Sequence, residues 1–137
     1  MTAPIVKGKQ YLLELEDLAY GGDAVGRVDN FAIFVPEGIP GEKVLVEITE
    51  VKKSFGRGRI IEVREPSPAR KEPACPIFRE CGGCQLKHID YRVQLDYKRQ
   101  MVSDVLARIG GIGLQVEPVI GMEFPHSYRN KARYALE

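Results

Sequence analysis

The sequence predicts a mainly β fold with an appended α segment: a small five-stranded barrel, then a cysteine-rich loop and one helix. Two observations support this prediction. Alternating apolar runs recur through the first 65 residues with no helical periodicity between them, and turn-forming residues separate these runs. Because five short strands that curl into a barrel hide their sheet edges, an OB-like barrel is the expected arrangement.

Five segments are expected as strands, at residues 10–18, 24–29, 31–35, 43–51 and 57–63. Gly21-Gly22 and Asp29-Asn30 tolerate positive φ and so favour tight turns between them. Three prolines in residues 65–73 remove backbone donors and predict a domain boundary. The expected organisation is a barrel at 1–65, a proline-rich linker at 66–73, a cysteine loop and helix at 74–112, and the start of a further β-containing domain at 113–137.

One helix is predicted at residues 91–109, with Asp90 as its N-cap and Gly110-Gly111 at its end. Its apolar residues recur at helical spacing and predict a face that packs against another element. They are Leu95, Val102, Val105, Leu106 and Ile109. Residues 128–137 are expected to form a strand with alternating cations. Because no partner strand follows it, we expect the sequence to be part of a longer protein.

The composition fits a globular domain, with 137 residues of which 44% are hydrophobic. No stretch approaches the roughly 20 apolar residues of a membrane helix, and the first ten residues lack the apolar core of a signal peptide. The expectation is a cytoplasmic protein without a membrane partner. The net charge of +1 hides a segregation of signs, because residues 1–50 hold four Lys/Arg against nine Asp/Glu and residues 51–71 hold seven against two.

The basic stretch combines cations with glycine and one aromatic residue, a composition suited to phosphate contacts and base stacking. The candidate RNA-binding residues here are Lys52, Lys53, Phe55, Arg57 and Arg59. The alternative is a solvated hairpin loop with no ligand.

All three cysteines of the chain, Cys75, Cys81 and Cys84, lie within ten residues. Zinc could take these thiolates with His88 as a fourth ligand, whereas a 4Fe-4S cluster would need a fourth thiolate that this sequence does not contain. Cys81 and Cys84 could instead form a redox pair, or all three cysteines could be inert. Spacing alone leaves zinc and iron–sulfur equal. We find no nucleophile with a base partner and no paired carboxylates that would support catalysis within this sequence.

Residues 17–27, followed by Phe34-Val35-Pro36 and Gly41-Glu42-Lys43-Val44, resemble a TRAM domain, an RNA-binding barrel found in several RNA-modifying enzymes. Cys75-Pro76 and residues 81–86, with the start of the helix, resemble the cysteine motif of RNA uracil-C(5) methyltransferases that act on ribosomal RNA. Tyr128-Arg129-Asn130-Lys131 is similar to that family's entry into its central domain, and this places Arg129, Asn130 and Lys131 among the candidate RNA-binding residues.

The resemblance implies a 4Fe-4S cluster held by Cys75, Cys81, Cys84 and a cysteine further downstream. It also implies S-adenosylmethionine as methyl donor, bound by a C-terminal domain, and a cysteine that attacks the uracil ring. This sequence has no cysteine after Cys84, so we expect it to recognise RNA without methylating it alone.

Two rival functions can be compared with this one. One is a stand-alone RNA-binding protein with a Cys₃His zinc site at Cys75, Cys81, Cys84 and His88. The second is an RNA methylthiotransferase, which would have Cys-x3-Cys-x2-Cys spacing and a barrel after the catalytic domain. The spacing and order in this sequence contradict this second rival.

Overall fold

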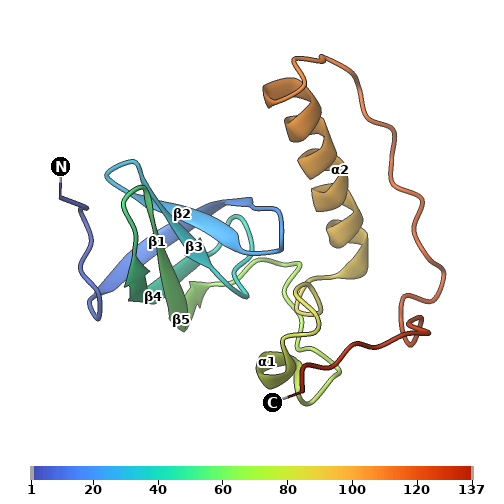
Figure 1. Ribbon diagram of the computed structural model, residues 1–137, viewed down its shortest axis with the longest axis horizontal. Coiled ribbons are helices and arrows are strands. Elements are labelled where there is room, and N and C mark those ends of the chain that lie inside the picture. The colour runs from blue at the N-terminus through green and yellow to red at the C-terminus, as the bar shows by residue number, and fades with distance from the viewer. Residues whose placement is uncertain (1, 137) are drawn as a thin grey trace.

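The computed structural model describes residues 2–136, and its N-terminal half is a closed barrel of five strands in the order β1-β2-β3-β5-β4 (Figure 1). The strands are β1 (Gln10–Leu18), β2 (Ala24–Val28), β3 (Phe31–Val35), β4 (Lys43–Val51) and β5 (Phe55–Glu65). Two helices follow, α1 (Phe78–Cys81) and α2 (Tyr91–Arg108). The predicted fold, mainly β with one main helix after the barrel, is confirmed. β5 extends two residues beyond the prediction at each end.

Every strand pair in the barrel is antiparallel except β3 with β5, which are parallel. This parallel pair closes the barrel, and it places Phe34 opposite Arg57. The pairing follows from the barrel topology rather than from any hairpin, so no local pattern in the sequence indicates it.

The barrel core alternates along each strand, as Leu13 and Leu15 in β1 illustrate. A β-bulge between Leu15 and Asp17 then shifts the alternation by one residue, so that Leu18 also faces inward. On β5, Gly58 is buried, and a Cβ at this position would collide with Val46. The glycine is therefore needed for close packing of β5 against β4.

The proline-rich segment after the barrel is attached to its neighbours at several points. Lys71 N donates to His88 O at 2.9 Å and Asp90 N donates to Ala69 O at 2.8 Å. Arg70 also reaches the barrel, where its guanidinium pairs with the buried carboxylate of Glu42 at 2.7 Å. The segment predicted as a linker is thus held to the barrel and to the start of α2.

α2 begins and ends where the sequence predicts. The Asp90 side chain accepts a hydrogen bond from Arg92 N at 3.0 Å, and Gly111 adopts a φ of 64° after the last turn. None of the helices within residues 2–136 is long and apolar enough to cross a membrane.

Only part of the predicted apolar face of α2 packs, because Leu95 and Leu106 are half-buried while its other three members are exposed. Tyr97 and Met101 pack against the barrel core. Val102, Val105 and Ile109 of the predicted apolar face are instead 50%, 53% and 83% exposed. The barrel meets α2 along an adjacent face, because the long side chains of Tyr97 and Met101 reach the core from there.

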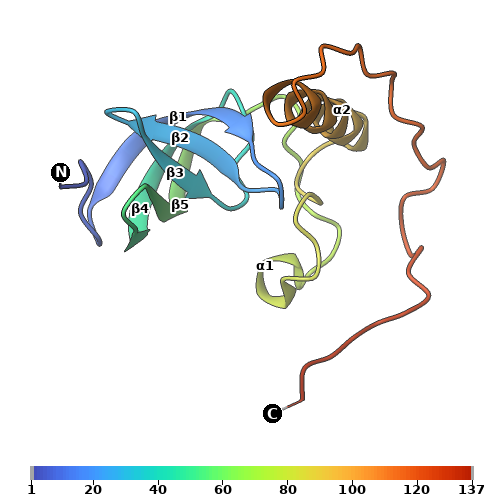
Figure 2. The same cartoon turned by 45° about the horizontal axis from the view of Figure 1, so that its top comes forward.

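Residues 113–136 contain no helix or strand, so the strand predicted at 128–137 is absent from its described part, residues 128–136. A strand needs a neighbour for its backbone donors and acceptors, and this segment has none within residues 2–136. Figures 1 and 2 show its first part on the side of α2 away from the barrel and its end returning below α2 toward α1. Two contacts hold it there: Arg99 Nε donates to Val116 O at 2.7 Å, and Met122 N donates to the Tyr91 hydroxyl at 2.9 Å.

Candidate nucleic-acid interface

The barrel surface carries a cluster of two aromatic rings and one guanidinium, which we call the aromatic patch: Phe34, Phe55 and Arg57. The rings of Phe34 and Phe55 meet edge to face, with centroids 5.4 Å apart and planes at 86°. The Arg57 guanidinium lies 5.9 Å from the Phe34 centroid and 5.7 Å from that of Phe55. Both rings are half-buried.

Phe34 is the member of this patch that sequence reasoning missed as a contact residue. The alternation of β3 places Phe34 on the outer face, between the buried Ile33 and Val35. That signal was present in the sequence. Its position opposite Arg57 depends on the parallel β3–β5 pairing, which the sequence did not reveal.

Three of the predicted cationic residues form exposed ion pairs. Lys52 lies 2.6 Å from a Glu50 carboxylate oxygen, and Arg57 lies 3.3 Å from an oxygen of Asp23. Arg59 donates to Glu47 through Nε at 3.1 Å and Nη2 at 2.9 Å. Exposed pairs of this kind contribute at most about 1 kcal/mol, so a phosphate can replace the carboxylate partner at little cost.

Lys52 also lowers the pKa of its partner. Its hydrogen bond lowers the pKa of Glu50, and the charges of Lys52, Arg57 and Lys7 lower it further. The remaining cation, Lys53, is exposed and has no ion pair within residues 2–136. It is therefore the cation at this hairpin most accessible to a phosphate.

The three cysteines are free thiols, with Cys81 exposed and Cys75 and Cys84 partly exposed. Within residues 2–136, no three side chains among His, Cys, Asp and Glu lie together closely enough to hold a metal ion. The donor type fits a soft metal or an iron–sulfur cluster. The conformation does not gather the donors at one point, and the ligand assignment remains a prediction.

His88 lies apart from the cysteines as a contact to the barrel. It is fully buried, its Nε2 is 3.5 Å from Gly38 O, and its ring centroid is 5.8 Å from that of Phe78. Burial lowers the pKa of His88, the hydrogen bond with Gly38 raises it, and the charge of Arg70 lowers it. The structure does not bring His88 together with the three thiols as a zinc site would require.

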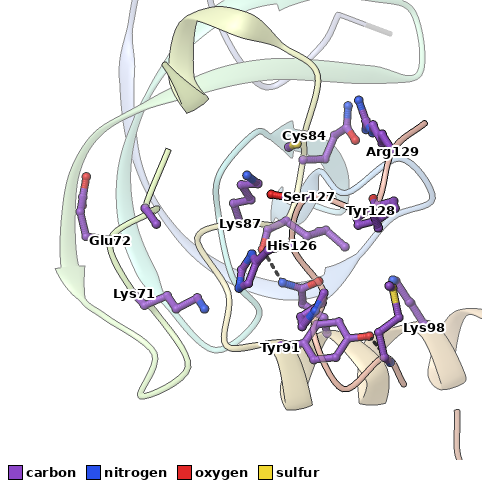
Figure 3. Close-up of a pocket in the computed structure, with 16 residues that line it drawn as sticks. Lys71, Glu72, Cys84, Lys87, Tyr91, Lys98, His126, Ser127, Tyr128 and Arg129 are labelled. Atoms are coloured by element: carbon purple, nitrogen blue, oxygen red, sulfur yellow. Dashed lines mark hydrogen bonds between the residues drawn. The ribbon is translucent and has the colours of Figure 1, made fainter. Parts of the chain in front are cut away.

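A second candidate surface is a pocket of about 710 Å³ between the cysteine loop, the first half of α2 and residues 122–129 (Figure 3). We call it the basic pocket. Its cationic lining residues are Lys71, Lys87, Lys98 and Arg129.

The basic pocket includes only part of what the sequence predicted. Of the predicted triad 129–131, Arg129 lines it and donates to Gly83 O at 2.8 Å, whereas Asn130 and Lys131 are exposed and lie outside its lining. The three lysines were missed because they come from segments separated by up to 27 residues, and only the fold brings them together.

Comparison with known proteins defines the class of the barrel first. Residues 6–61 match the family model of the TRAM domain, a range that starts ahead of β1 and ends within β5. The barrel is a TRAM domain, as the sequence predicted.

Similarity to relatives extends beyond the barrel. The chain is 46% identical to an uncharacterized RNA methyltransferase of Halalkalibacterium halodurans over 96% of this chain and 29% of the relative. Proteins of the same description match at 45% identity in Clostridium tetani, over 97% of this chain and 29% of the relative, and at 44% in Bacillus cereus, over 99% and 30%. The chain therefore spans about 30% of the length of these relatives.

Among solved structures, the solution structure of a conserved protein from Methanococcus maripaludis is similar to this chain. It has 34% identity and a TM-score of 0.43, over 44% of this chain and 87% of that protein.

Proposed function

We propose that this chain is the RNA-recognition and iron–sulfur part of an S-adenosylmethionine-dependent RNA uracil-C(5) methyltransferase that acts on ribosomal RNA. The observation that carries the proposal is a TRAM barrel with two outward aromatic rings and a guanidinium on its surface. The relatives named RNA methyltransferases support it, because their similarity continues through the cysteine loop and α2.

The aromatic patch suits single-stranded RNA. A base that stacks on Phe34 or Phe55 gains about 1–3 kcal/mol without any requirement for base identity. Arg57 can exchange its exposed contact with Asp23 for a phosphate, and Lys53 is already free of ion pairs within residues 2–136. The patch therefore grips the strand, and sequence selection comes from elsewhere in the complete protein.

The role of this chain in methylation is to hold RNA. The methyl donor S-adenosylmethionine and the attacking cysteine belong to the rest of the enzyme in this proposal. The chain's own three cysteines are free thiols of one loop, for which this proposal assigns metal binding and no attack on uracil. We expect the isolated chain to bind RNA and to transfer no methyl group.

For the cysteine loop we propose a 4Fe-4S cluster held by Cys75, Cys81, Cys84 and one further cysteine of the complete protein. Three accessible thiols beside a glycine pair support this assignment, because the loop can rearrange around a metal centre. The cluster would fix the loop as a structural centre. Nothing in uracil methylation requires it to transfer electrons.

The RNA interface is tested by replacing Lys52, Lys53, Arg57 and Arg59 with alanine together. We expect weaker binding of single-stranded RNA and a salt dependence less steep by up to about 3 in log–log slope, since each lost phosphate contact removes about 0.7. Arg64→Ala is the matched control, because Arg64 lies on the same strand and pairs only with Glu62 within residues 2–136. An unchanged slope in the fourfold variant contradicts the interface.

The cluster is tested in the complete protein by Cys81→Ser. We expect loss of iron and of the broad absorption at roughly 400 nm that iron–sulfur centres give. Iron retained at full stoichiometry would exclude Cys81 as a ligand, and a colourless protein with bound zinc would favour the zinc alternative.

A further inference from the structure

The basic pocket differs from the aromatic patch in the state of its charges. Lys52, Arg57 and Arg59 at the barrel are neutralised by carboxylates. Lys71, Lys87 and Lys98 in the pocket form no ion pair within residues 2–136, and Arg129 donates only to a backbone carbonyl.

Among the described residues, the single carboxylate that lines the basic pocket, Glu72, is already engaged. Arg79 Nη1 lies 3.0 Å from its oxygen, and this hydrogen bond is the main reason why the pKa of Glu72 is lowered. Glu72 therefore stays ionised with Arg79 as its partner. Four cations remain around one hollow, which attracts anions strongly.

The pocket also has room and stacking surfaces for more than a free phosphate. Its volume of about 710 Å³ lies within the usual range of ligand pockets. Tyr91, Tyr128 and His126 line it together with the cations, and Figure 3 shows these rings around the hollow. Phosphate-binding cations with interleaved rings are the pattern of single-stranded nucleic-acid sites.

A smaller pocket of about 210 Å³ adjoins the basic pocket on the side of the barrel. It shares Cys84 and Gln85 with the basic pocket, and it includes Asp23, the partner of Arg57 in the aromatic patch. Its second carboxylate, Glu37, lies 3.1 Å from Arg79, so both acids along this path are paired with guanidinium groups.

The barrel and the cysteine loop touch directly at this connection. A Cβ placed on Gly22, in the turn between β1 and β2, would lie 2.8 Å from the Cβ of Gln85. The turn that carries Gly22 and Asp23 therefore packs directly against the cysteine loop.

We propose that the basic pocket is a second contact site for the same single RNA strand that occupies the aromatic patch. The strand crosses the cysteine loop at Cys84 and Gln85. Lys87, Lys98 and Arg129 then take its phosphodiester groups, and an unstacked base lies against Tyr91 or Tyr128. This inference rests on the proposed RNA binding and extends it to the path of the strand.

The test compares two unstructured oligonucleotides on the 137-residue chain by fluorescence anisotropy. One has about four nucleotides and the other about twelve, within the range of sites that OB folds occupy. The pocket variant is Lys87→Ala with Lys98→Ala. The matched control is Arg64→Ala with Arg108→Ala, which removes the same charge from exposed positions outside both surfaces.

We expect the pocket variant to lose roughly tenfold in affinity for the longer oligonucleotide and about 1.4 in salt slope, with binding of the shorter one unchanged. The control pair should behave as wild type with both. Circular dichroism spectra that match wild type establish that each variant is folded.

Three results would overturn the inference. In the first, the pocket variant binds the longer oligonucleotide as tightly as wild type, while the fourfold variant of Lys52, Lys53, Arg57 and Arg59 binds both oligonucleotides more weakly. The second site is then wrong and the proposed function stands. In the second, the pocket variant loses the same factor of affinity for both oligonucleotides, and the pocket is then no separate site. If neither oligonucleotide binds wild type, the proposed function fails as well.

Discussion

Arg70→Ala should strongly destabilise the fold, because it removes the countercharge of a buried carboxylate. The Glu42 carboxylate is fully buried and accepts four hydrogen bonds. Arg70 donates two of them at 2.7 Å, Ile39 N donates one at 2.8 Å, and Ser67 N donates one at 3.1 Å. Removal of Arg70 leaves a buried carboxylate with two backbone donors and no countercharge.

Breaking a buried ion pair from one side costs about 3–5 kcal/mol. Arg70 is 19% exposed, so water can enter the vacated space, and we expect the free energy of unfolding to fall by about 3 kcal/mol. For a chain of this size that lowers the melting temperature by roughly 10 °C. Replacing both Glu42 and Arg70 with methionine should cost less than Arg70→Ala alone, because no uncompensated charge then stays buried.

The assay is urea unfolding followed by far-ultraviolet circular dichroism, which reports on the barrel without tryptophan. Arg59→Ala is the control, since Arg59 also makes a two-bond contact to a carboxylate, that of Glu47 at 3.1 and 2.9 Å, but is 66% exposed. We expect the control to lose less than about 1 kcal/mol. If Arg70→Ala and Arg59→Ala cost the same, the reasoning from burial is refuted.

Two further predictions concern stability. Gly58→Ala should destabilise the barrel by about 1–3 kcal/mol in urea unfolding, because the added Cβ collides with Val46. Gly113→Ala is the control and should be neutral, since its Cβ would lie in open space. Equal effects of the two substitutions would refute this prediction. Burial lowers the pKa of His88 below its ordinary 6.5, so the unfolded chain takes up the proton first and stability should fall as pH drops below about 6.5. His88→Gln should remove this pH dependence, and an unchanged loss of stability between about pH 6.5 and pH 5 would contradict the assignment.

The barrel could be predicted because its signals are local. Alternation of apolar residues identified all five strands, and Asp29-Asn30 identified a turn in which both residues adopt positive φ. Asp90 and Gly111 likewise marked the ends of α2 from their own chemistry.

The contacts between distant segments could not be predicted in the same way. Phe34 lies beside Arg57 because β3 and β5 pair in parallel, and Lys71, Lys87 and Lys98 meet only after the chain folds back around the cysteine loop. The predicted packing face of α2 was right only in part, since Leu95 and Leu106 are half-buried whereas Val102, Val105 and Ile109 are exposed. Apolar spacing identifies a face without identifying its partner.

The cysteine loop is attached to the barrel at three points. Glu42 holds Arg70 ahead of the loop, Gly38 contacts His88 after it, and Gly22 touches Gln85 within it. These three contacts hold both ends and the middle of a loop of about 20 residues, so the base of the loop has little freedom to move relative to the barrel. A metal centre in that loop would order the remaining exposed tip beside the barrel surface that we propose for RNA. A loop ordered in this way would fix the direction in which an RNA strand leaves the TRAM domain, which is a structural task that a cluster with constant oxidation state can perform.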